Sequence, residues 1–158
     1  MSTTTDAQIC YGILFDDGFT FPWDDEKYES DIEDWWEDLH NFKPSIDLYK
    51  TFGQKPPKEA VALVVKERSD FYKQFPLPVT LVNYCYIDTP MFILAIPSSC
   101  ITANRGYPEK IYPASLSVSE NEIESLLHFC NKYCPQIDNP NNVYLESDAS
   151  WFLSSYWG

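Results

Sequence analysis

The stretch PVTLVNYCYIDTPMFILAIP, residues 78–97, contains the two strongest strand patterns of the chain. β-Branched and aromatic residues dominate both 78–87 and 91–97, as is typical of strands. The intervening Asp88-Thr89-Pro90 is too short for a crossover helix and therefore predicts a tight antiparallel connection. We expect this pair of strands to form the centre of a sheet.

Shorter strand patterns surround this pair. Residues 9–15 predict a first strand, and residues 143–146 and 151–156 predict two closing strands. Residues 60–66 are ambiguous, because their β-branched side chains favour a strand whereas their apolar spacing would also suit a short helix after Pro57. We prefer a strand for this segment.

Two capping-box patterns predict the starts of helices. Ser30-Asp31-Ile32-Glu33 precedes a helix over about residues 31–42, and Ser119-Glu120-Asn121-Glu122 precedes one that runs to about Tyr133. The apolar side chains of the first helix share one face, and its acids share the opposite face. Together the patterns predict an α+β fold, with both helices packed on a mostly antiparallel sheet. We expect a single domain over residues 1–158 in which residues 1–7 form a disordered tail.

Composition is that of a folded protein with a sizeable core. The chain has 158 residues, 44% of them hydrophobic and 16% aromatic, which is too apolar for a disordered acidic tail. Neither a signal peptide nor a membrane span is evident, so we expect a cytoplasmic protein without membrane contact. The five cysteines lack CxxC spacing. For Cys130 and Cys134, four residues apart, core packing is favoured over metal binding.

The negative charge is concentrated in one segment. Residues 16–38 hold eleven of the 24 carboxylates and a single lysine, which gives this segment a net charge of −10 out of −13 for the chain. Such a field attracts basic partners and repels nucleic acid, so we expect no direct nucleic-acid binding. A solvated helix face is the simplest alternative, and the segment does not match the calcium-loop pattern. The candidate partner-binding residues are Asp24, Asp25, Glu26, Asp31, Glu33, Asp34, Glu37 and Asp38.

A second candidate site lies in the segment Asn104-Arg105-Gly106-Tyr107. Arg105 is one of only two arginines in the chain, and a guanidinium offers a bidentate fork to carboxylate or phosphate. With Asn104 and Tyr107 it could bind a small anionic, nucleotide-like ligand. An internal ion pair of Arg105 is the competing interpretation, since carboxylates are plentiful.

Catalytic signatures are missing from the sequence. Nucleophilic catalysis would need a Cys or Ser with a His, and His40 and His128 are the only histidines. The glycine-rich and metalloprotease motifs are absent. We therefore favour a protein without enzymatic activity and expect neither a metal nor a cofactor.

Four blocks of sequence resemble a group of small acidic proteins encoded by phages and prophages. The blocks are Phe21-Pro22-Trp23, DIEDWW at 31–36, ANRGYP at 103–108 and WFLSSYWG at 151–158. The resemblance implies no functional residues. It implies an accessory factor that binds and blocks host or defence machinery, as anti-CRISPR and anti-restriction proteins do. Our leading hypothesis is an inhibitor of a basic host or defence protein that handles nucleic acid, with imitation of DNA as one mode of binding. A virion or assembly protein is a further alternative.

Overall fold

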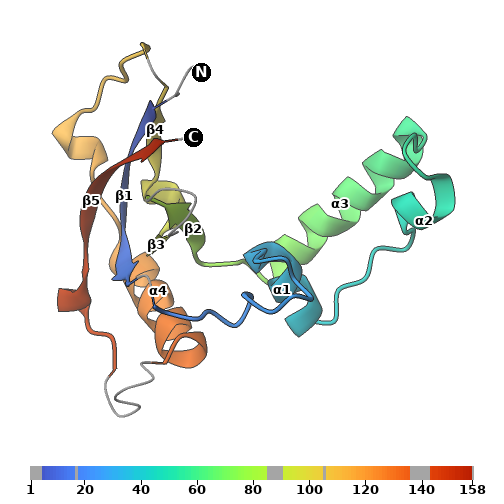
Figure 1. The fold of residues 1–158 in the computed structure, drawn as a ribbon, viewed down its shortest axis with the longest axis horizontal. Coiled ribbons are helices and arrows are strands. Elements are labelled where there is room, and N and C mark those ends of the chain that lie inside the picture. Colours follow the sequence, from blue (N-terminus) through green and yellow to red (C-terminus); the bar gives the residue numbers. More distant parts are fainter. Residues whose placement is uncertain (1–4, 17, 85–90, 105, 136–142, 158) are drawn as a thin grey trace. The chain divides into compact units, whose positions relative to one another are not determined.

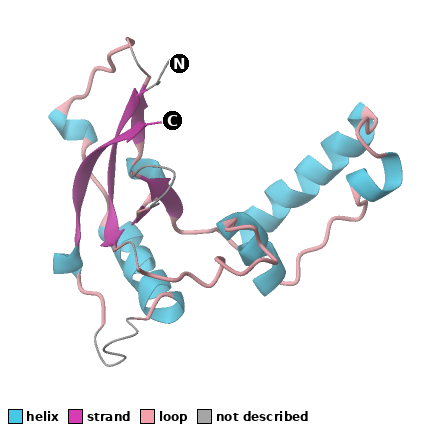
Figure 2. Ribbon diagram, viewed as in Figure 1, coloured by secondary structure: helices cyan, strands magenta, loops and turns pink. Residues whose placement is uncertain are grey.

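The chain forms an α+β fold with one antiparallel sheet and several helices (Figure 1) (Figure 2). A computed structural model describes residues 5–16, 18–84, 91–104, 106–135 and 143–157. The predicted fold class is confirmed.

The described residues divide into two compact units. One, here called the sheet unit, comprises Met1–Pro22 and Pro78–Gly158, and the other, the helical unit, comprises Trp23–Leu77. The prediction of a single domain stays a prediction, because compactness alone does not make each unit fold independently.

Strand β1 (Thr5–Phe15) runs through the middle of the sheet. β5 (Ala149–Trp157) pairs along one edge of β1, and β4 (Ile101–Ala103) and β3 (Phe92–Ala95) pair along the other. β2 (Thr80–Asn83) extends the sheet beyond β3, and all of these pairings are antiparallel. β1 is therefore the strand on which the others assemble.

The strand pair predicted over 78–87 and 91–97 forms, in shorter form, as β2 and β3. Its predicted place at the centre of the sheet is wrong, because β1 accepts partners on both edges whereas β2, within the described residues, pairs with β3 only. The predicted connection Asp88-Thr89-Pro90 lies outside the described residues.

Two further expectations about the strands need correction. Residues 5–7 do not belong to a disordered tail, since they open β1 and pair with residues 155–157 of β5. Residues 143–146 do not form a strand, because the Asn131 side chain takes up the hydrogen-bonding groups of Tyr144. Its Oδ1 accepts from Tyr144 N at 2.6 Å, and its Nδ2 donates to Tyr144 O at 3.1 Å. A side-chain amide thus replaces a neighbouring strand.

Helix α4 (Glu120–Tyr133) in the sheet unit starts as predicted. Ser119 and Glu122 form the capping box, and Glu122 also accepts a hydrogen bond from Ser98 Oγ at 2.5 Å. These bonds lower the pKa of Glu122 to about 2. Cys130 and Cys134 are fully buried free thiols, so their predicted role in core packing is confirmed.

The helical unit contains α1 (Ile32–Leu39), α2 (Leu48–Phe52) and α3 (Lys58–Gln74). The strand predicted over 60–66 is wrong, because these residues lie within α3. Val64 and Phe71, two helical turns apart, are its buried residues, and this spacing serves packing on one face of a helix. Tertiary packing here overrides the strand preference of the valines.

Aromatic rings make up the centre of the helical unit. Trp36 Nε1 donates to Phe75 O at 3.0 Å, which ties α1 to the end of α3. His40 lies between these residues, with its ring centroid 4.3 Å from that of Trp36 and 4.6 Å from that of Phe75. Phe42 stacks on Phe71 at 4.6 Å. Ile32, Trp35 and Trp36 of the apolar face predicted for the first helix are thus buried, whereas Leu39 of that face is 42% exposed.

The close approach of β1 to β3 at Gly12 gives a first prediction. A Cβ at Gly12 would lie 2.3 Å from Leu94 O and 2.8 Å from Ala95 Cα. Gly12→Ala should therefore lower the free energy of unfolding by about 1–3 kcal/mol, as overpacking in a core does. Urea denaturation followed by tryptophan fluorescence measures the change.

Gly18→Ala is the matched control, because an added Cβ there has no neighbour within 4 Å. We expect a change within about 0.5 kcal/mol. Equal unfolding midpoints for the two variants would contradict the close contact at Gly12.

Candidate functional site: the acidic segment

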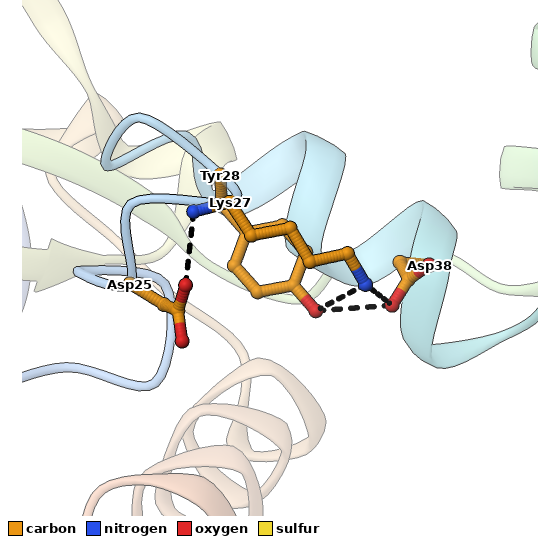
Figure 3. A network of polar contacts seen from close by, with 4 residues as sticks. All are labelled: Asp25, Lys27, Tyr28 and Asp38. Atoms are coloured by element: carbon orange, nitrogen blue, oxygen red, sulfur yellow. Dashed lines mark hydrogen bonds and ion pairs between the residues drawn. The ribbon is translucent and has the colours of Figure 1, made fainter.

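The acidic segment begins in a loop that is held against α1 by one network (Figure 3). Lys27 Nζ lies 2.8 Å from Asp38 Oδ2, and Tyr28 OH donates to the same oxygen at 3.0 Å. Within the loop, Asp25 Oδ1 accepts from the backbone N of Lys27 at 2.9 Å. Asp38 and Tyr28 raise the pKa of Lys27, and Lys27 and Tyr28 lower that of Asp38. The only lysine of the segment is thus committed to Asp38.

Asp31 caps the first turn of α1. Its Oδ1 accepts from Glu33 N at 2.7 Å and from Asp34 N at 3.1 Å. The capping box predicted from Ser30 is wrong, because Ser30 has φ 64° and the cap is one residue later. Glu33 and Asp34 stand in the first turn, where the helix dipole favours negative charge.

Glu37 was expected on the water-facing side of the helix, and this expectation is wrong. Its side chain is buried between α1 and α3, where Arg68 Nε lies 2.9 Å from Oε1 and Arg68 donates through a second nitrogen to Oε2 at 3.2 Å. Tyr72 OH also donates to Oε1, at 3.4 Å. Burial raises the pKa of Glu37, and Arg68 opposes that rise. Glu37 therefore joins helices and does not face a partner.

Seven exposed carboxylates remain in eleven residues, 24–34. We call this set the acidic surface, and its members are Asp24, Asp25, Glu26, Glu29, Asp31, Glu33 and Asp34. Six of them were predicted as partner-binding residues, and Glu29 is added by its exposure. The acidic surface differs from the predicted set because it excludes Glu37 and Asp38 of α1 and includes Glu29 of the loop before the helix.

The helical unit is divided in charge. Residues 24–38 hold nine carboxylates and one lysine, net −8, whereas residues 39–77 hold seven lysines and arginines against four carboxylates, net +3. The acidic run alone does not reveal this division, but a count of the bases downstream of it would have done so. The negative field is thus confined to one part of the unit.

The second candidate site is only partly described. Asn104 is exposed, Tyr107 is 74% exposed, and a turn joins them through a hydrogen bond from Tyr107 N to Asn104 O at 2.9 Å. Arg105 lies outside the described residues. Binding of an anionic ligand through these residues stays a prediction.

Groups of three or more potential metal ligands do not occur among the described residues. His40 packs in the aromatic core of the helical unit, and His128 is exposed on α4. Among the described residues, neither imidazole is hydrogen-bonded to a thiol or a hydroxyl.

Comparisons of the chain with protein-family models, with curated proteins and with solved structures give no match. In the part of the chain that the structure describes, none of the helices has the length and apolar character to span a bilayer.

Removal of the cation beside Glu37 gives a second prediction. Arg68→Gln removes the positive charge that opposes the effect of burial on the pKa of Glu37. The folded-state pKa of Glu37 should therefore rise further above its unfolded value. An acid shifted in this direction favours folding below its ordinary pKa, and that contribution is lost as pH rises through the folded-state value. We expect a loss of about 1–3 kcal/mol in the free energy of unfolding at pH 7 and a smaller loss at pH 4, measured by urea denaturation.

Lys73→Gln is the control on the same helix. It removes an exposed ion pair with Asp70, whose Oδ1 lies 2.7 Å from Lys73 Nζ, and should change the free energy of unfolding by less than about 0.5 kcal/mol. A loss in Arg68→Gln that is equal at both pH values would show that Glu37 is not the group responsible.

Proposed function

We propose that this chain is a non-enzymatic binding protein whose acidic surface engages a basic, nucleic-acid-binding surface of another protein. The observation that supports this function best is the exposure of seven carboxylates within residues 24–34. Only one lysine lies among them, and it is paired with Asp38. Dense negative charge of this kind accelerates association with a basic partner and makes binding sensitive to salt.

The arrangement favours an irregular acidic contact over imitation of a regular row of phosphates. Glu37 of α1 is buried, and Asp38, although exposed, is paired with Lys27. Glu33 and Asp34 are therefore the exposed carboxylates of α1 outside this ion pair. The others extend from the loop and cap before the helix. Proteins that bind DNA or RNA remain the proposed partner class, because their surfaces present clustered lysine and arginine.

The helical unit also exposes apolar side chains suited to a protein contact. Val61, Leu63 and Val65 on α3 are 36%, 43% and 61% exposed, and Tyr49 on α2 is 76% exposed. Exposed apolar groups contribute affinity at interfaces where charge contributes mainly rate and specificity. The resemblance to phage proteins makes bacterial host and defence proteins the first partners to test.

A four-site neutralised variant tests the proposed function. Its substitutions are Glu26→Gln, Glu29→Gln, Glu33→Gln and Asp34→Asn. These side chains are exposed, so the fold should be retained. We expect affinity capture from a bacterial lysate, read by mass spectrometry, to yield basic nucleic-acid-binding proteins with the wild type and to lose them with the variant. Adding wild-type protein should displace labelled duplex DNA from the captured proteins.

The control variant removes the same number of charges from the sheet unit. Its substitutions, all at exposed positions, are Glu109→Gln, Glu120→Gln, Glu124→Gln and Glu146→Gln. If this control still captures the same proteins, binding depends on the charges of the acidic surface and not on the net charge of the chain. Identical captured sets for wild type and both variants would refute a binding role for the acidic surface.

A further inference from the structure

Two cysteines of the sheet unit face each other across neighbouring strands. Ile9 of β1 is paired with Ile101 of β4 in an antiparallel register. The next step along that register sets Cys10 opposite Cys100, the residue before β4. Cys100 packs against the buried cluster that contains Cys10, and its thiol donates to Ile96 O at 3.6 Å. The two cysteines are 90 positions apart in sequence, so only the pairing of β1 with β4 brings them together.

This placement suits a covalent bond between the sulfurs. Directly opposed residues of antiparallel strands have Cα atoms about 4.5–5.5 Å apart. Disulfides span Cα separations of about 4.4–6.8 Å. Both cysteines are free thiols in this structure, and a bond between them requires no change of strand register.

The two thiols differ in environment. Cys10 is 1% exposed and packs with Val82, Ile93 and Ala95, whereas Cys100 is partly exposed beside this cluster. The polar neighbours Cys10 and Ser99 lower the pKa of Cys100 to about 7, although burial opposes this shift. The neighbouring thiol of Cys100, together with burial, raises the pKa of Cys10. Cys100 is therefore the better nucleophile at neutral pH, and Cys10 is placed to react second.

We propose that Cys10 and Cys100 form a redox-active thiol pair that a peroxide converts into a cross-strand disulfide. Cys100 thiolate attacks one peroxide oxygen and breaks the O–O bond, which yields a sulfenic acid and a hydroxide that takes up a proton. The sulfur of Cys10 then attacks the sulfur of Cys100. The Cys10 proton and the displaced hydroxide leave as water, so two thiols lose two electrons and hydrogen peroxide becomes two molecules of water.

The bond would join β4 to β1 covalently. β4 contains three residues and, among the described strands, pairs with β1 only, so it is held by few backbone hydrogen bonds. A disulfide between Cys10 and Cys100, 90 positions apart, would close a long loop and so lower the conformational entropy of the unfolded chain. Oxidation should therefore raise the midpoint of thermal unfolding, and reduction with dithiothreitol should reverse the rise.

Oxidation of the full chain with hydrogen peroxide tests the proposal. We expect the count of free thiols, measured after denaturation, to fall from five to three, and peptide mapping to find one linked pair that contains Cys10 and Cys100. Cys130, in α4, and Cys134, which directly follows α4, are internal controls, because both are fully buried. Burial also raises the pKa of Cys130 to about 12.

Two variants separate the steps. Cys10→Ser should stop at the sulfenic acid of Cys100, which dimedone traps, and Cys100→Ser should retain all four of its thiols under the same treatment. A wild-type map in which Cys10 or Cys100 is linked to Cys85, Cys130 or Cys134, or in which both stay reduced, would overturn the proposal. This map needs no variant, so the test holds even if a substitution impairs folding.

Discussion

Strand β1 is hydrogen-bonded along both edges, and the sheet unit depends on this double pairing. β3, β4 and β5 come from distant parts of the chain, and each pairs with β1. The close backbone contact at Gly12 and the opposition of Cys10 and Cys100 both follow from its registers. Because these contacts join residues far apart in sequence, the sheet forms only after long loops close, which is a slow step for a chain of this size.

Features controlled by neighbouring residues were predictable from the sequence. The capping box of α4 needs only Ser119 and Glu122, three positions apart, and the structure contains both of its hydrogen bonds. The β2 and β3 pair was predictable because strand propensity and a short connection agree. The exposure of Asp24, Asp25 and Glu26 was predictable for a similar reason, since a run of charges in a loop has no apolar face to bury.

Features controlled by distant residues were not predictable. The helical pattern places Glu37 on the polar face of α1, and its burial depends on Arg68 and Tyr72, one turn apart on α3 and more than thirty residues later. The strand predicted over 60–66 was wrong for a similar reason. Val64 and Phe71 are buried because they pack inside the helical unit, and the sequence of 60–66 alone does not show this packing. Residues 143–146 do not form the predicted strand, because the side chain of Asn131 bonds the backbone of Tyr144. In each case a tertiary partner decides between local alternatives of similar energy.

The acids of the helical unit have different physical roles, and this limits the shape of a complementary partner. Asp31 caps α1, Asp38 holds Lys27, and Glu37 joins α1 to α3, so these three contribute to the fold. The other carboxylates of 24–34 are exposed, and residues 39–77 of the same unit carry net positive charge. A partner with a uniformly basic surface would be attracted by 24–34 and repelled by the lysines of α2 and α3. For the basic partner that we propose, the best complement is therefore a basic patch of limited extent, flanked by neutral or acidic groups, because repulsion from the lysines would disfavour a larger one.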